Sequence, residues 1–159
     1  MKPKSRWYHW VLAVSLVAVG SLGFADPAQA VDLEFKQARA AVVVSTLPPQ
    51  QERFRKCVAH RESRNNPRAQ NKRSSAQGTY QFLDSQWRRG LAHMVTAALR
   101  DRGVNVKGLK RELRSTPIKR WDPLLQDVAF AEVLNARGKW SGWKHWYLAG
   151  STCNALVVR

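Results

Sequence analysis

The chain has 159 residues, of which 27 are Lys or Arg and 11 are Asp or Glu, so its formal net charge at pH 7 is +16. A hydrophobic fraction of 44% is enough to bury a core, which excludes disorder for the chain as a whole, and the length suits one ordinary domain. The charge makes polyanions the expected partners, but composition does not choose among nucleic acid, anionic lipid and an acidic wall polymer.

Residues 1–30 have the pattern of a secretory signal peptide. Three basic residues within the first six precede an apolar run over residues 11–25, and Ala28-Gln29-Ala30 has the spacing of a cleavage site. The run is short for a membrane span, which needs about 20 residues, although the aromatic residues before it could extend it. We therefore expect cleavage after Ala30 and a secreted or envelope-associated protein, with an uncleaved membrane anchor as the alternative.

Export would change the meaning of the cysteines and of the charge. Cys57 and Cys153 allow one intramolecular pairing, and an even number of cysteines outside the cytoplasm favours a disulfide over two buried free thiols. An exported basic protein meets wall polymers and lipid head groups, so we expect no nucleic-acid partner. The alternative is that the charge only improves solubility.

After a lead-in segment, residues 31–51, the pattern becomes helical. Phe54, Cys57, Val58 and Arg61 recur at i, i+3, i+4 and i+7, which predicts a helix from Gln50 to about Glu62 or Ser63. The prolines at 48 and 49 are expected to separate this helix from the lead-in segment. Asn65-Asn66-Pro67 is expected to end the helix, and residues 64–75 are polar and predicted to be irregular.

Two more helices are predicted further along the chain. One starts near Asp84-Ser85, with Ser85 as its N-cap, and stops at Gly103. The other starts at Asp122-Pro123, where an N-cap precedes a proline at the first helical position, and stops at Gly138. Because long period-two alternation is absent, we predict a compact, mainly α-helical single domain over residues 52–159.

The stretch between these two helices is strongly basic. Lys107, Lys110, Arg111 and Arg114 share one helical face. Such a face is usually a solvated surface, but here it adds to an already basic domain and could hold it on anionic polymers.

The sequence contains one acidic residue in a position typical of a catalytic group. No metal-ligand spacing, nucleophile elbow or phosphate-binding loop occurs, so we expect neither a metal nor a cofactor. Glu62 stands at the predicted end of a helix with an apolar face. A carboxyl group there can be partly buried by the core and still face a cleft, as a general acid requires.

The residues around Glu62 resemble a known family. Cys57 to Asn71, with Glu62-Ser63 and Pro67-x-Ala69-x-Asn71, together with Ser75-Ala76-Gln77-Gly78-Thr79-Tyr80-Gln81-Phe82 and Trp87, is similar to transglycosylase-like members of the lysozyme superfamily. In those enzymes a helix ends in Glu-Ser, and a loop and a small-residue turn with Gln-Phe follow it. A weaker resemblance to domains related to resuscitation-promoting factors continues through Asp122-Pro123, Gln126-Asp127 and Cys153, so the match covers roughly residues 53–153.

The resemblance implies a lysozyme-like fold and cleavage of the β-1,4 bond between N-acetylmuramic acid and N-acetylglucosamine in peptidoglycan. Glu62 would protonate the leaving oxygen and then act as a base, by lytic transglycosylation or by hydrolysis. The implied substrate-binding residues are Gln81, Tyr80, Gly78 and Ser63. A second carboxylate could come from Asp84 or Asp122. The expected partners are peptidoglycan strands and anionic wall polymers, and the expected state is a monomer.

Three departures from the family pattern support an alternative function. Arg64 and Ser75 stand where glycine is most common, and residues 88–120 are longer and more basic than in the smallest relatives. The alternative is a non-catalytic cationic wall-binding protein on the same fold, and a basic membrane-active protein is a third interpretation. The tryptophans are expected to belong to the core more than to a sugar platform: Trp87, Trp140, Trp143 and Trp146.

Overall fold

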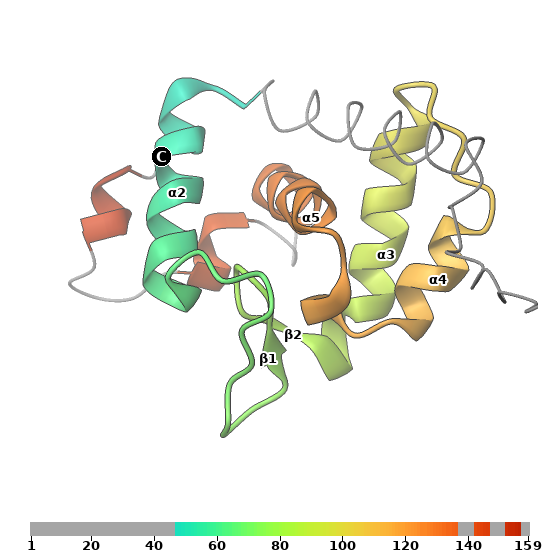
Figure 1. Ribbon diagram of the computed structural model, residues 1–159. Coiled ribbons are helices and arrows are strands. Elements are labelled where there is room, and N and C mark those ends of the chain that lie inside the picture. The colour runs from blue at the N-terminus through green and yellow to red at the C-terminus, as the bar shows by residue number, and fades with distance from the viewer. Residues whose placement is uncertain (1–46, 137–141, 147–151, 157–159) are drawn as a thin grey trace, which may run out of the picture.

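The computed structural model describes residues 47–136, 142–146 and 152–156, and within these ranges the protein is mainly α-helical, as predicted (Figure 1). The predicted signal peptide, its cleavage site and most of the lead-in segment lie outside the described residues, as do Gly138 and Trp140. The elements are α2 (Pro49–Ser63), β1 (Ala76–Gln77), β2 (Phe82–Leu83), α3 (Asp84–Arg100), α4 (Leu109–Ser115), α5 (Pro123–Asn135) and the 3₁₀ helices η1 (Ile118–Arg120), η3 (Gly142–Trp146) and η4 (Thr152–Leu156).

Helix α2 confirms the predicted first helix. It begins at Pro49 rather than after the prolines, because a proline at the first helical position loses no hydrogen bond and has a helical φ already. It ends at Ser63, where Arg64 takes the left-handed conformation and its N–H caps the helix. Glu62 is thus the penultimate residue of α2.

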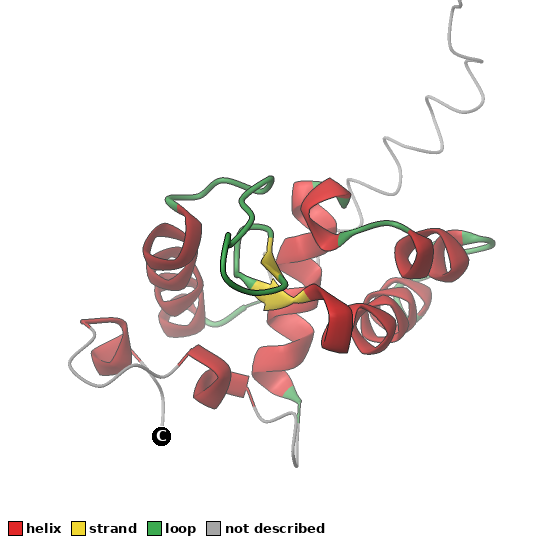
Figure 2. Ribbon diagram, turned by 90° about the horizontal axis from the view of Figure 1, so that it is seen from below, coloured by secondary structure: helices red, strands yellow, loops and turns green. Residues whose placement is uncertain are grey.

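The segment after α2 is irregular and closes with a short hairpin. Strands β1 and β2 pair antiparallel, with Ala76 opposite Leu83 and Gln77 opposite Phe82. The hairpin turn, residues 78–81, joins β1 to β2, and β2 runs directly into α3. Two of the turn residues, Tyr80 and Gln81, line a pocket together with Glu62 at the end of α2. Figure 2 shows the two strands, in yellow, at the place where the helices meet.

The starts of α3 and α5 differ in how they are capped. Asp122 accepts a hydrogen bond from the Leu124 N–H at 2.8 Å, which confirms the predicted N-cap of α5. The predicted N-cap of α3, Ser85, is wrong, because the helix begins at Asp84 and Leu83 takes the N-cap position without a side-chain hydrogen bond. The Ser85 hydroxyl instead donates to the Ser75 hydroxyl at 2.9 Å.

Helix α5 lies at the centre of the described fold. It runs between α2 on one side and α3 with α4 on the other (Figures 1 and 2). Val128, Ala129, Phe130 and Val133 are all fully buried, because the helix is covered on several sides. Among the described helices, none has the length and apolar content needed to cross a bilayer.

Candidate active site

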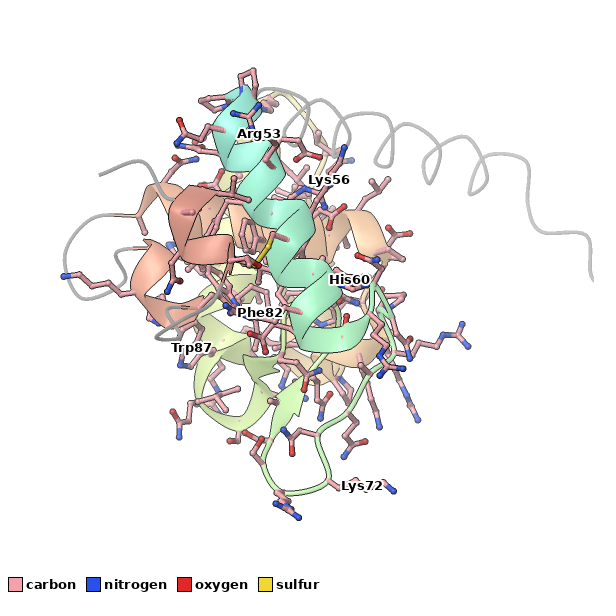
Figure 3. All side chains as sticks on the ribbon, turned by 90° about the vertical axis from the view of Figure 1, so that its left-hand side faces the viewer. Arg53, Lys56, His60, Lys72, Phe82 and Trp87 are labelled. Atoms are coloured by element: carbon pink, nitrogen blue, oxygen red, sulfur yellow. A yellow bond between two sulfur atoms is a disulfide. The ribbon has the colours of Figure 1, made fainter. Side chains whose placement is uncertain are left out.

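A pocket of about 360 Å³ brings together residues from four parts of the chain, and its size suits a small ligand or one sugar residue. Glu62 comes from α2, residues 80–83 from the hairpin, Trp87 from α3, and Lys144, His145 and Trp146 from η3. In Figure 3, Phe82 and Trp87 lie beside the C-terminal half of α2. Three of the predicted site residues, Glu62, Tyr80 and Gln81, therefore line one pocket.

The Glu62 carboxylate is held at one oxygen and open at the other. Its Oε1 accepts hydrogen bonds from Arg61 Nη2 at 2.7 Å and from Arg61 Nε at 3.1 Å. The same Nη2 also donates to the Trp146 carbonyl at 2.6 Å, which links α2 to η3. Within the described residues Oε2 has no hydrogen-bond partner, and the side chain is 27% exposed. A ligand in the pocket could reach that oxygen.

Strained backbone occurs beside this carboxylate. In the described ranges the non-glycine residues with positive φ are Arg64 at 56°, Asn65 at 63° and Gln81 at 52°. The first two directly follow Glu62-Ser63, and the third lines the pocket. Left-handed backbone costs a non-glycine residue about 1–2 kcal/mol, and strain of this kind gathers at functional sites.

The side-chain amide nitrogen of Gln81 holds the turn, and its oxygen is left available. Its Nε2 donates to the Gly78 carbonyl at 3.0 Å, while its Oε1 makes no hydrogen bond within the described residues. The side chain lies in the pocket lining with an acceptor available for a sugar hydroxyl or an N-acetyl N–H.

Ser63 and Gly78 lie outside the pocket lining, and both have structural contacts. The Ser63 hydroxyl donates to the Ala59 carbonyl at 3.1 Å and accepts from the Asn66 N–H at 3.1 Å, so it closes the end of α2. Gly78 has φ +78°, and a Cβ there would meet the Oε1 of Gln126 at 2.5 Å. Only glycine fits this turn without displacing a buried side chain.

Gln126 is fully buried and organises the loops around the turn. Its Oε1 accepts from the Thr79 N–H at 2.8 Å, and its Nε2 donates to the carbonyls of Pro67 and Trp121 at 3.1 Å each. All three contacts are hydrogen bonds to backbone groups of loops. The Gln126 side chain therefore satisfies backbone groups that have no partner in a helix or strand.

Tyr80 joins a buried charged network that the sequence analysis did not identify. Its hydroxyl accepts from Arg55 Nη1 at 2.6 Å and donates to Asp127 Oδ1. Arg55 also pairs with Asp127 at 3.0 Å and with Glu52 at 2.7 Å. The local signal for part of it was the i, i+3 spacing of Glu52 and Arg55, which makes them neighbours on the surface of α2.

The network shifts the pKa values of its members in different directions. Burial, followed by the nearby Asp127 charge, raises the pKa of Tyr80, so the hydroxyl stays protonated as a donor. Burial also raises the pKa of Asp127, against the opposing effects of Tyr80 and Arg55. The hydrogen bond from Arg55 lowers the pKa of Glu52. These groups stabilise the contact between α2, α5 and the turn, and of the four residues only Tyr80 also contributes to the pocket lining.

Neither of the predicted second carboxylates lines the pocket. Asp84 is 7% exposed, accepts from the Ile118 N–H at 2.9 Å and lies 3.6 Å from an Arg88 nitrogen. Asp122 caps α5. Glu62 is the one carboxylate among the described residues of the lining.

Aromatic side chains form the wall opposite Glu62's helix end. The Trp87 ring lies edge-on to His145 with centroids 4.3 Å apart, and the Phe82 and Trp87 centroids are 6.0 Å apart. Trp87 is half-buried, so it both packs on the core and lines the pocket. Trp146 is buried and donates its Nε1 hydrogen to the Tyr80 carbonyl at 3.0 Å, as expected of a core residue. The side chain of Trp143 lies outside the described residues.

The predicted disulfide is confirmed. Cys57 in α2 and Cys153 in η4 are bonded, with Cα atoms 5.6 Å apart and a sequence separation of 96 (Figure 3, yellow bond). It ties the C-terminal part of the chain to the helix that carries Glu62. In the described ranges no group of three or more His, Cys, Asp or Glu side chains could hold a metal ion.

Comparisons with known proteins gave no match: no protein-family model, no curated protein and no solved structure matches the chain. The function therefore has to be argued from the pocket and from the chemistry of its residues.

Proposed function

We propose that the protein is a lysozyme-like, peptidoglycan-cleaving enzyme that acts on the β-1,4 bond between N-acetylmuramic acid and N-acetylglucosamine. The observation that carries the proposal is the position of Glu62, at a helix end, in a pocket that it shares with Gln81 and an aromatic wall. A general acid needs a carboxyl group that a substrate can reach, and sugar rings pack well on aromatic faces.

In the proposed reaction Glu62, in its protonated form, donates its proton to the glycosidic oxygen as the bond to the muramyl C1 breaks. The carboxylate then takes a proton from the muramyl C6 hydroxyl as this oxygen bonds to C1. The proton on Glu62 is restored, and the products are a new hydroxyl end and a 1,6-anhydro end. The Gln81 Oε1 would accept a hydrogen bond from the sugar and fix its position.

Lytic transglycosylation is favoured over hydrolysis by the carboxylates of the pocket. Most glycoside hydrolases place two carboxyl groups around the scissile bond. Here Asp84 and Asp122 are engaged elsewhere, and Glu62 is the one carboxylate in the described lining. An internal nucleophile removes the need for a second carboxylate.

The test is digestion of purified peptidoglycan by the wild-type protein and by Glu62→Gln, with mass analysis of the products. The exchange keeps the size of the side chain but removes the transferable proton, so we expect at least a hundredfold loss of cleavage. Glu112→Gln makes the same change at an exposed position of α4 and should keep full activity. Products lighter by one water indicate anhydro ends, whereas reducing ends indicate hydrolysis.

A non-catalytic wall-binding protein is the second candidate, and the ion pair on Glu62 favours it. Arg61 neutralises one oxygen of this carboxylate and fixes it to η3. In that case neither the wild type nor Glu62→Gln releases products, while both bind walls equally. A Glu62→Gln variant with wild-type activity would contradict the proposed role of Glu62 and leave the activity to another residue.

A further inference from the structure

A second concave surface, which we call the basic groove, lies between α3 and α4. Its volume is about 820 Å³, and its lining contains five cationic side chains together with Gly108 and Ser115. All five cations are exposed: Arg89 of α3, Lys107 of the turn before α4, and Lys110, Arg111 and Arg114 of α4. Figure 1 places α4 on the far side of α5 from α2.

The packing of α4 explains why these charges gather there. Leu109 and Leu113 are buried against the core, so α4 has one apolar face. Lys110, Arg111 and Arg114 are exposed residues of α4. Lys107 lies before the helix, because Gly108 takes the N-cap position with φ 80°, so the prediction that Lys107 shares one helical face with the other three is wrong. Arg89, from the neighbouring helix, adds a fifth charge to the groove.

These charges are not balanced within the described part of the protein. None of the five cations forms an ion pair there, in contrast to Arg55, Arg61 and Arg88, which all lie close to carboxylates. Glu112, the acidic residue of α4, is exposed but does not belong to the lining. Like charges crowded in one concave surface repel each other, and a bound polyanion would remove that repulsion.

We propose that the basic groove binds a phosphodiester-linked anionic polymer that carries no bases. Three arginines favour phosphate, since guanidinium groups bind phosphate oxygens through two parallel hydrogen bonds. Single-stranded nucleic acids need aromatic platforms for their bases, and the lining of the groove contains no aromatic side chain among the described residues. A chain of phosphates joined by small polyols would bind the groove through its charges alone.

This site is separate from the proposed glycan cleavage and does not depend on it. The test measures binding of a synthetic poly(glycerol phosphate) to the purified protein at several salt concentrations, without any enzymatic readout. The groove variant is Lys107→Gln/Arg111→Gln/Arg114→Gln. The matched control, Arg53→Gln/Lys72→Gln/Arg73→Gln, removes one lysine and two arginines from exposed positions elsewhere (Figure 3).

We expect the groove variant to lose at least tenfold in affinity at 0.1 M salt, and the slope of log affinity against log salt to fall by about 2. The control variant should lose less than about threefold, and thermal unfolding should show both variants folded. Equal losses in the two variants would overturn the proposal, because net charge rather than the groove would then bind the polymer. Tighter binding of a single-stranded oligonucleotide with the same number of phosphates would overturn the assignment to a polymer without bases.

Discussion

Glu62 and Asp127 are both carboxylates close to Tyr80, but they differ in whether they line the pocket. Glu62 lines a pocket, keeps one oxygen open and is paired through the other with a single arginine. Asp127 lies outside the pocket lining, is 19% exposed, and uses the same oxygen, Oδ1, to accept from the Tyr80 hydroxyl and to pair with Arg55. The first is placed where a ligand can use it, and the second where it stabilises the contact between helices.

The comparison shows that position, rather than residue type, separates a candidate catalytic group from a structural one, because Glu62 lines the pocket and Asp127 does not. Their surroundings distinguish the two carboxylates, because a carboxyl group outside the pocket lining is not placed to exchange a proton with a ligand bound in the pocket.

Removal of the disulfide should give the largest difference between the two regions. The pocket contains C-terminal residues that the bridge holds in place, and the Asp127 network does not. Cys57→Ser/Cys153→Ser is expected to lower the free energy of unfolding by about 4–5 kcal/mol, since the bridge closes a loop of 96 residues. Urea denaturation measures the loss. Hydrogen exchange should increase more in η3 and η4 than in α5, and equal increases would show that the pocket side has no special dependence on the bridge.

Substituting each of the two carboxylates in turn tests the comparison directly. Asp127→Ala should destabilise the protein by about 1–3 kcal/mol, because it leaves the buried Tyr80 hydroxyl without its acceptor, while Arg55 keeps its ion pair with Glu52. Glu62→Gln should change stability by less than about 0.5 kcal/mol. Thermal and urea unfolding of the two variants give the answer, and a large loss in Glu62→Gln would make Glu62 structural too.

The strained end of α2 should give a smaller effect of opposite sign. Arg64→Gly is expected to stabilise the protein by about 1 kcal/mol, because glycine takes φ 56° without steric cost. Arg53→Gly, within the same helix, is the control and should destabilise it by about 1 kcal/mol. If Arg64→Gly is also destabilising, contacts of the arginine side chain outweigh the backbone strain.

The smallest effect concerns acid stability. The pKa of Glu52 is lowered from its ordinary 4.5, so the unfolded chain binds protons more readily than the folded protein, and this contribution to stability is lost as the pH falls. The pKa of Asp127 is raised, so its contribution has the opposite sign and falls as the pH rises.

Asp127→Asn removes the opposing contribution. Its stability should therefore fall more steeply than that of the wild type between about pH 5 and pH 3, by less than about 1 kcal/mol. Glu52→Gln should instead reduce the loss on acidification. Urea unfolding at several pH values distinguishes these slopes, and parallel profiles for the three proteins would contradict the assigned directions.

Much of the helical framework follows from local sequence alone. The apolar spacing of Phe54 and Val58, the cap-and-proline pair Asp122-Pro123 and the even number of cysteines predicted α2, α5 and the disulfide, because periodicity, capping and pairing depend on near neighbours or on simple counting. The preference for glycine at position 64 also has a local cause, since the position has positive φ.

The surroundings of the site were decided only by tertiary structure. The sequence does not show that Arg61 reaches the Trp146 carbonyl, that Gln126 fills the space beside Gly78, or that Asp84 bonds the Ile118 N–H. The first contact joins residues 85 positions apart and the third joins residues 34 positions apart. In both, the partner is a backbone group that almost any residue type would supply, so the residue type at that position gives no signal. Sequence pattern identified the carboxylate at the end of α2, but only packing decided which side chains surround it and which other carboxylates are kept away from it.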